Sequence, residues 1–186
     1  MIKALVFLAT GFEEIEAVTI IDILRRADIT VTTAGLTSNP IEGAHKVKIV
    51  ADKSVDEMFA HEFDAIICPG GSPGYKNLRR DPRVIQIIKN AHKQNKLVAA
   101  ICAAPAVLSD AAILENKNCT IYPGMENELI KGGGIPNPDN VVVDGNIVTS
   151  KGPATALEFA LTVVELLAGK QVADSVCRKV LADNRC

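Results

Sequence analysis

The sequence predicts an α/β fold built on a mostly parallel β-sheet with helices on both faces. Short apolar segments rich in β-branched residues alternate with longer segments of helical periodicity along nearly the whole chain. The short segments are apolar at successive positions, which is typical of parallel strands buried on both faces. No internal repeat, low-complexity tract or long linker interrupts the 186 residues, so we expect one domain over residues 1–186.

The elements follow from these patterns and from the turn and capping residues between them. Strands are predicted at 2–9, 29–34, 64–68, 97–101, 119–122, 141–143 and 147–150. Helices are predicted at 13–27, 55–59, 81–94, from 105 onward, 153–168 and 172–181. The alternating polarity of 41–50 indicates a hairpin or excursion, and the glycine-rich segment 132–138 is predicted to be a surface loop.

Composition excludes several classes of function. Hydrophobic residues make up 48% of the chain and charged residues 23%, with a formal net charge of −2, so nothing favours nucleic acid or an anionic membrane. No apolar run is long enough to span a bilayer. The five cysteines show no C-x-x-C spacing, which indicates a reducing cytoplasm and neither a disulfide framework nor a zinc site.

Cys102 lies at the junction between a buried strand and a helix that Pro105 can open. A cysteine at such a turn is close to unpaired helix N–H groups and to the positive end of the helix dipole, both of which favour the thiolate. The layout is that of a nucleophile elbow with sulfur in place of a serine oxygen. An inert, buried cysteine at a strand end explains this segment equally well.

Ligands of such sheets bind beyond the carboxyl ends of the strands. Three segments of this chain follow strand ends, at 10–16, 69–74 and the Cys102 turn, and we expect them to converge. Gly70 and Gly71 would let backbone N–H groups approach a ligand oxygen, although an ordinary tight turn also accounts for them. The first strand is not followed by a G-x-G-x-x-G fingerprint, and no Walker A motif is present, which disfavours nucleotide cofactors.

Three glutamates begin the first predicted helix. Helical spacing aligns Glu16 with a stripe that should face the sheet, but Glu13 aligns with apolar residues too, so periodicity does not decide between them. Glu14 aligns with a mixed stripe nearer the edge, and its substitution is expected to have little effect. An inward carboxyl beside a thiolate would be protonated and donate to sulfur. The alternative is an acidic first turn that only complements the helix dipole.

The histidines exclude an ordinary Cys-His pair in the usual chain order, because all three precede Cys102. His61 and His92 lie in polar contexts typical of the surface. His45 lies in the 41–50 excursion and is a candidate for lining the site.

Four motifs together resemble the ThiJ/PfpI superfamily, and more narrowly its DJ-type branch, over almost the whole chain. They lie at 4–16, 69–71, 99–105 and 149–155. The resemblance implies a flavodoxin-like three-layer sandwich, a homodimer and no organic cofactor or metal. It also implies a reactive cysteine paired with a protonated glutamate, which correspond to Cys102 and Glu16, and oxyanion N–H groups at Gly71 and Ala103.

The sequence departs from that branch at one position. Many members carry a histidine near the cysteine, where this chain has Tyr122, a poor base near neutral pH. His45 aligns roughly with a family arginine and would compensate only in part. Gly70, His45, Tyr122 and Pro153 are therefore candidate site-lining residues without assigned chemistry.

Two classes of function follow from the resemblance. As an enzyme, the protein would act on methylglyoxal, glyoxal or early glycation adducts on proteins, as glyoxalases and deglycases of the family do. As a binding protein, it would be an oxidative-stress sensor or redox-regulated chaperone that uses the same cysteine. A peptidase is disfavoured, because Ala103 stands where peptidase relatives carry histidine.

Overall fold

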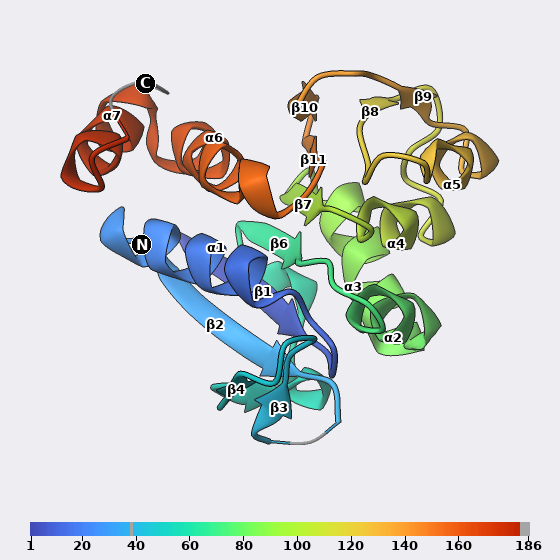
Figure 1. The fold of residues 1–186 in the computed structure, drawn as a ribbon, viewed down its shortest axis with the longest axis horizontal. Helices are drawn as coiled ribbons and strands as arrows, with labels where there is room; N and C mark the ends of the chain where they lie inside the picture. The colour runs from blue at the N-terminus through green and yellow to red at the C-terminus, as the bar shows by residue number, and fades with distance from the viewer. Residues whose placement is uncertain (38, 183–186) are drawn as a thin grey trace.

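The computed structural model describes residues 1–37 and 39–182. A seven-stranded sheet forms the centre, in the order β10-β11-β7-β6-β1-β2-β5 (Figure 1). Strand β10 pairs antiparallel with β11 at one edge, and the other pairings in this sheet are parallel. The sheet strands are β1 Lys3–Leu8, β2 Thr30–Gly35, β5 Lys53–Ser54, β6 Ala65–Cys68, β7 Leu97–Ile101, β10 Val141–Asp144 and β11 Ile147–Ser150.

Helices cover both faces of the sheet and bury two separate apolar layers (Figure 1). One face carries α1 Glu14–Arg26, α6 Ala156–Ala168 and α7 Lys170–Lys179; the other carries α2 Gly74–Arg80, α3 Pro82–Lys93 and α4 Pro105–Asp110. Adjacent β1 residues serve opposite layers: Val6 packs with Ile20 and Phe159, whereas Phe7 packs with Ile88 and Val107. The predicted three-layer α/β sandwich with a mostly parallel sheet is confirmed.

Several short helices and strands differ from the elements predicted from the sequence. The predicted short helix at 55–59 is confirmed only over Val55–Glu57, which forms a 3-10 turn; Met58 is extended, and a second 3-10 turn follows at Ala60–Glu62. The 41–50 hairpin is confirmed as β3 Ile41–Glu42 paired with β4 Lys48–Ile49. Helices α2 and α5 Glu126–Lys131 were not predicted. A third 3-10 turn, Pro153–Thr155, precedes α6.

The region after α4 differs most from expectation. The predicted 119–122 strand is reduced to β8 Asn118–Cys119, which pairs with β9 Ile135–Pro136 in a separate two-stranded sheet. The predicted surface loop at 132–138 therefore contributes a strand, although Ile135 and Pro136 are exposed. Thr120 leaves the strand because its N–H binds the hydroxyl of Thr149 at 2.9 Å.

Strand order changes direction between β1 and β6, because the chain passes from β1 outward to β2 and returns to place β6 on the other side. Such a switch point is the usual ligand site of an open parallel sheet. The segments that follow β1, β6 and β7 meet there, as the sequence predicts. Among the residues that the structure describes, the helices are all too short or too polar to cross a membrane.

Candidate active site

Cys102 occupies a strained turn directly after β7. Its φ is +62°, a left-handed conformation that costs a non-glycine residue of the order of 1–3 kcal/mol. Two main-chain hydrogen bonds hold the turn: the Cys102 N–H donates to Ser150 O at 2.9 Å, and Cys102 O accepts from Tyr122 N at 2.8 Å. The end of β11 and the segment after β8 therefore fix the direction in which the thiol points.

Glu16 approaches the thiol from α1, on the other side of the switch point. The residue is fully buried, and its Oε2 accepts from the N–H of Gly70 at 2.8 Å. The start of α1 is fastened to the same loop, because Glu13 N donates to Gly70 O at 3.0 Å. Among the residues that the structure describes, no nitrogen or oxygen donor reaches the buried Oε1 of Glu16. A proton on that oxygen, shared with the Cys102 sulfur beside it, relieves the cost of an unpaired buried charge.

The carboxyl and the thiol are electrostatically coupled. Burial raises the pKa of Glu16 to about 7, and the Gly70 N–H opposes part of that rise. Burial also raises the pKa of Cys102 to about 12, and the negative charge of Glu16 adds to this rise. The N–H groups of the turn lower the pKa of the thiol, as the sequence predicts, but burial and the Glu16 charge outweigh them. Protonation of Glu16 removes its negative charge and turns the carboxyl into a hydrogen-bond donor to sulfur, which lowers the cost of forming the thiolate relative to the state in which both groups are ionised.

Two backbone N–H groups, those of Ala103 and Gly71, reach the sulfur and lower the pKa of the thiol. The family resemblance implies that these two residues are oxyanion donors, and the structure brings both to Cys102. The lack of a side chain at Gly70 lets this loop lie close to Cys102, since a Cβ at position 70 would lie 2.6 Å from the Cβ of Cys102. Gly71 has a φ of +92° and packs against the backbone before α1, so a side chain does not fit.

His45 and Glu14 form a separate contact beside this centre. The Nδ1 of His45 lies 2.9 Å from Oε2 of Glu14 and 3.7 Å from Oε2 of Glu13. His45 thus lies against the first turn of α1, and its bonds go to these carboxylates. The expectation that Glu14 faces the edge of the helix and solvent is wrong, because Glu14 is buried and accepts from the N–H groups of His45 and Val47. The small effect expected of its substitution on the thiol stays a prediction.

Tyr122 and Pro153 lie on the two segments that hold the elbow. Tyr122 donates its backbone N–H to Cys102 O, and its half-exposed ring is the nearest neighbour of Gly152. Pro153 follows Gly152, just beyond the strand end that accepts the Cys102 N–H. Sequence reasoning missed the anchoring roles of Ser150 O and of the β3–β4 hairpin. Neither has a sequence signal, since main-chain acceptors and long-range turns leave no motif.

The other cysteines in the described part of the chain are poorly placed for chemistry. Cys68 and Cys119 are fully buried, and burial raises the pKa of Cys68 to about 12 and that of Cys119 to about 11. Cys177 is also buried. Cys186 lies outside the described residues. Cys102 is partly exposed and has the Glu16 carboxyl hydrogen-bonded to its sulfur.

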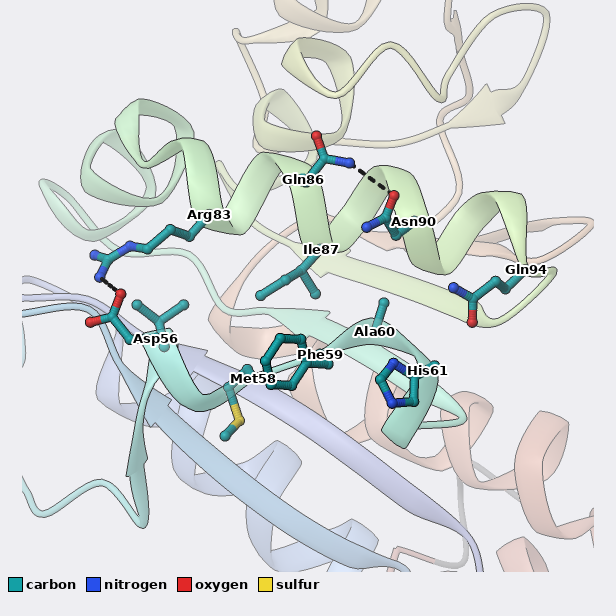
Figure 2. Close-up of a pocket in the computed structure, with 11 residues that line it drawn as sticks. Asp56, Met58, Phe59, Ala60, His61, Arg83, Gln86, Ile87, Asn90 and Gln94 are labelled. Atoms are coloured by element: carbon teal, nitrogen blue, oxygen red, sulfur yellow. Dashed lines mark hydrogen bonds and ion pairs between the residues drawn. The ribbon is translucent and has the colours of Figure 1, made fainter.

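A cavity of about 310 Å³ lies away from Cys102, between α3 and the 3-10 turns that follow β5 (Figure 2). Figure 2 shows Gln86, Asn90 and Gln94 along α3, with Phe59 and His61 on the opposite wall. Neither Cys102 nor Glu16 lines this cavity. Its size does not make it the reactive site, because it brings no nucleophile together with an acid.

The geometry defines a class: a flavodoxin-like α/β protein with a cysteine on a strand-to-helix elbow and a buried carboxyl beside the sulfur. The DJ-1/PfpI family model matches residues 2–166. The chain therefore belongs to the DJ-1/PfpI family, and the resemblance seen in the sequence is confirmed.

Known relatives cover nearly the full chain. The Parkinson disease protein 7 homolog of Danio rerio is 40% identical over 179 residues, or 94% of each chain. The glutathione-independent glyoxalase DJR-1.2 of Caenorhabditis elegans is 36% identical over 166 residues, 89% of this chain and 88% of that one. The crystal structure of Drosophila melanogaster DJ-1beta superposes with a TM-score of 0.92 at 38% identity, covering 97% of both chains.

Proposed function

We propose that the protein is a cofactor-free cysteine enzyme that converts methylglyoxal and glyoxal to hydroxy acids and acts on early glycation adducts on proteins. The contact between Glu16 and Cys102 carries this proposal. It puts a proton-transfer group with a pKa of about 7 beside the nucleophile, near the value suited to general acid–base catalysis at neutral pH. The glyoxalase name of the Caenorhabditis elegans relative supports the same activity.

The chemistry uses the pair as one unit. Glu16 accepts the thiol proton as sulfur attacks the aldehyde carbon, and returns it to the aldehyde oxygen to give a hemithioacetal. The N–H groups of Gly71 and Ala103 stabilise negative charge next to the sulfur. Glu16 then removes the hydrogen from this carbon and delivers a proton to the neighbouring carbon, while the hydroxyl proton passes from the first oxygen to the ketone oxygen, which leaves a thioester of the 2-hydroxy acid. Water hydrolyses the thioester, so that methylglyoxal yields lactate and the thiol is restored.

Lactate formation from methylglyoxal by the purified protein tests the proposal. Wild type is expected to produce lactate without glutathione or added cofactor, and Cys102→Ala is expected to produce none. Cys68→Ala, which changes the buried cysteine on the neighbouring strand, is the matched control and keeps its activity. Turnover that persists in Cys102→Ala would refute the proposal.

A second candidate is an oxidative-stress sensor or redox-regulated chaperone. The observation in its favour is that the partly exposed sulfur already has two N–H donors and a carboxyl around it, which can also hold sulfinate oxygens. Two equivalents of peroxide convert the thiol to the sulfinic acid and release two waters. Mass spectrometry after limiting peroxide is expected to find this product at Cys102. Equal oxidation of Cys68 or Cys119 would exclude a dedicated sensor.

We also propose a homodimer that uses α1. Ile15 is 57% exposed and Val18 48% exposed on the side of the helix that turns away from the buried Ile20. Arg26, at the end of the same helix, pairs with Asp22 at 2.6 Å and remains accessible. Light scattering at micromolar concentration is expected to give twice the chain mass, and Ile15→Glu is expected to give a monomer. A monomeric mass for wild type overturns this assembly.

A further inference from the structure

Three potential metal donors from two chain segments meet at the start of α1. Glu13 is the N-cap residue of the helix, Glu14 is its first residue, and His45 comes from the β3–β4 hairpin. One oxygen of each carboxylate and one imidazole nitrogen lie within 4.8 Å of one another. The nitrogen is 2.9 Å from Glu14 Oε2 and 3.7 Å from Glu13 Oε2.

The surrounding backbone holds one of these carboxylates in place. Oε1 of Glu14 accepts from His45 N at 2.6 Å and from Val47 N at 3.3 Å, so Oε2 is the oxygen directed at the imidazole. Gly43 lets the hairpin close over this carboxylate, because a Cβ at that position would lie 2.3 Å from Oε1. Backbone groups that fix an oxygen in this way serve as outer-shell support in metal sites.

The charges at this point are unbalanced. Among the ion pairs of the described residues, Glu13 and Glu14 have His45 as their single partner, so two carboxylates face one imidazole. Both glutamate side chains are largely covered, at 13% and 11% exposure, whereas the His45 side chain is 71% exposed. Solvent therefore reaches the three donors from the imidazole side, and a cation arriving there would compensate the excess negative charge.

We propose that Glu13, Glu14 and His45 form a binding site for a divalent transition-metal ion of the zinc or cobalt type. One imidazole with two carboxylates is a donor set that suits Zn²⁺ and leaves a fourth position for water. Tetrahedral ligands at about 2.0–2.2 Å from zinc are separated by roughly 3.3–3.6 Å. The imidazole nitrogen lies 2.9 and 3.7 Å from the two carboxylate oxygens, which brackets that range, and all three donor atoms lie within 4.8 Å of one another. Side-chain shifts of this size would bring them to the spacing of zinc ligands.

This site is distinct from the thiol, although it lies near it. Glu13 donates its main-chain N–H to Gly70 O, and Gly70 in turn donates to Glu16. The ion is bound by nitrogen and oxygen, without sulfur. Metal binding does not depend on the proposed turnover of aldehydes and is measured separately from it.

Calorimetric titration of Zn²⁺ into the apo protein, in a buffer that does not chelate metal, tests the site. We expect one ion per chain. His45→Ala and Glu13→Gln are each expected to weaken binding at least tenfold. His61→Ala, which removes the other histidine with a ring near the surface, is the matched control and keeps the wild-type affinity. Cys102→Ser also keeps it, because sulfur is not a ligand.

Titration with Co²⁺ adds a spectroscopic readout. Nitrogen and oxygen ligation gives weak visible bands, whereas a thiolate ligand adds an intense near-ultraviolet charge-transfer band. Bands of the first kind that disappear in His45→Ala support the site. Absence of saturable binding in wild type overturns it, as does binding that is lost in Cys102→Ser and unchanged in His45→Ala.

Discussion

Glu14 and Glu16 stand two residues apart on α1, and both are buried, yet their acidities shift in opposite directions. Burial raises the pKa of Glu14, but hydrogen bonds from the His45 ring and from the His45 and Val47 N–H groups outweigh it, so the net pKa is lowered. Burial dominates at Glu16, where Gly70 is the single backbone donor, and the pKa rises to about 7. The number of hydrogen-bond donors at each buried carboxyl therefore decides whether its pKa falls or rises.

The largest expected effect is the loss of turnover when Glu16, and no other acidic residue of α1, is substituted. Glu16→Gln keeps a hydrogen-bond donor beside sulfur but cannot exchange protons, so methylglyoxal turnover should fall by about 10²–10⁴-fold, the usual contribution of a general acid–base group. Asp22→Asn, an exposed acidic position on the same helix, is the control and should leave the rate unchanged. Steady-state lactate assays measure both. A wild-type rate in Glu16→Gln would show that this carboxyl does not transfer the protons.

The raised pKa of Glu16 also predicts a dependence of stability on pH. Between about pH 4.5 and 7 the folded state binds this proton and the unfolded state does not, so stability decreases as pH rises through that window. The full loss is about 3 kcal/mol, from roughly 1.4 kcal/mol per pKa unit.

Urea unfolding at pH 5 and pH 8 of wild type and Glu16→Gln isolates the contribution. The stability of wild type relative to the variant should be lower at pH 8 by about that amount. A pH-independent difference would mean that Glu16 keeps an ordinary pKa in the fold.

For Glu14, whose pKa is lowered by hydrogen bonds, we predict an effect on stability. Glu14→Gln weakens three charge-assisted hydrogen bonds that tie the β3–β4 hairpin to α1, and should lower the free energy of unfolding by about 1–2 kcal/mol. Thermal or urea unfolding measures the change, and hydrogen exchange at His45 and Val47 should become faster. Unchanged stability together with unchanged exchange would show that these bonds contribute nothing.

The smallest expected effect is at Glu13, whose negative charge contributes to the raised pKa of Glu16. Glu13→Gln removes that charge, so the pKa of Glu16 should fall slightly and the acidic limb of the pH–rate profile should move to lower pH. The profile of the Glu13→Gln variant measures this shift. Movement of the limb to higher pH would contradict the assigned sign.

The fold was predictable because its causes are local and repeated. Apolar segments such as Leu97–Ile101 fill strands buried on both faces, and Pro105 and Pro82 mark helix starts, so the layers and the convergence of loops follow from pattern alone. Helices α2 and α5 are only a few residues long and lack a full amphipathic repeat, so their sequence patterns did not predict them.

The sequence was enough to name the residues of the candidate site, but not to predict which of them carry a proton. The elbow motif pointed to Cys102, and the resemblance to Glu16, Gly71 and Ala103. The sequence gives no measure of burial around sulfur, and burial reverses the expected shift of the Cys102 pKa. The role of Glu14 was out of reach for a related reason, because its partners His45 and Val47 are more than thirty residues away in the chain.

Gly70 packs so closely between Cys102 and Glu16 that no larger residue fits at position 70. A methyl group there would lie 2.6 Å from the Cβ of Cys102, 2.8 Å from Oε2 of Glu16 and 3.0 Å from the carbonyl oxygen of Ile101. At Gly152, across the same elbow, it would meet Tyr122 only at an ordinary 3.6 Å. A library of random variants selected for activity should therefore retain glycine at position 70 and accept alanine at 152.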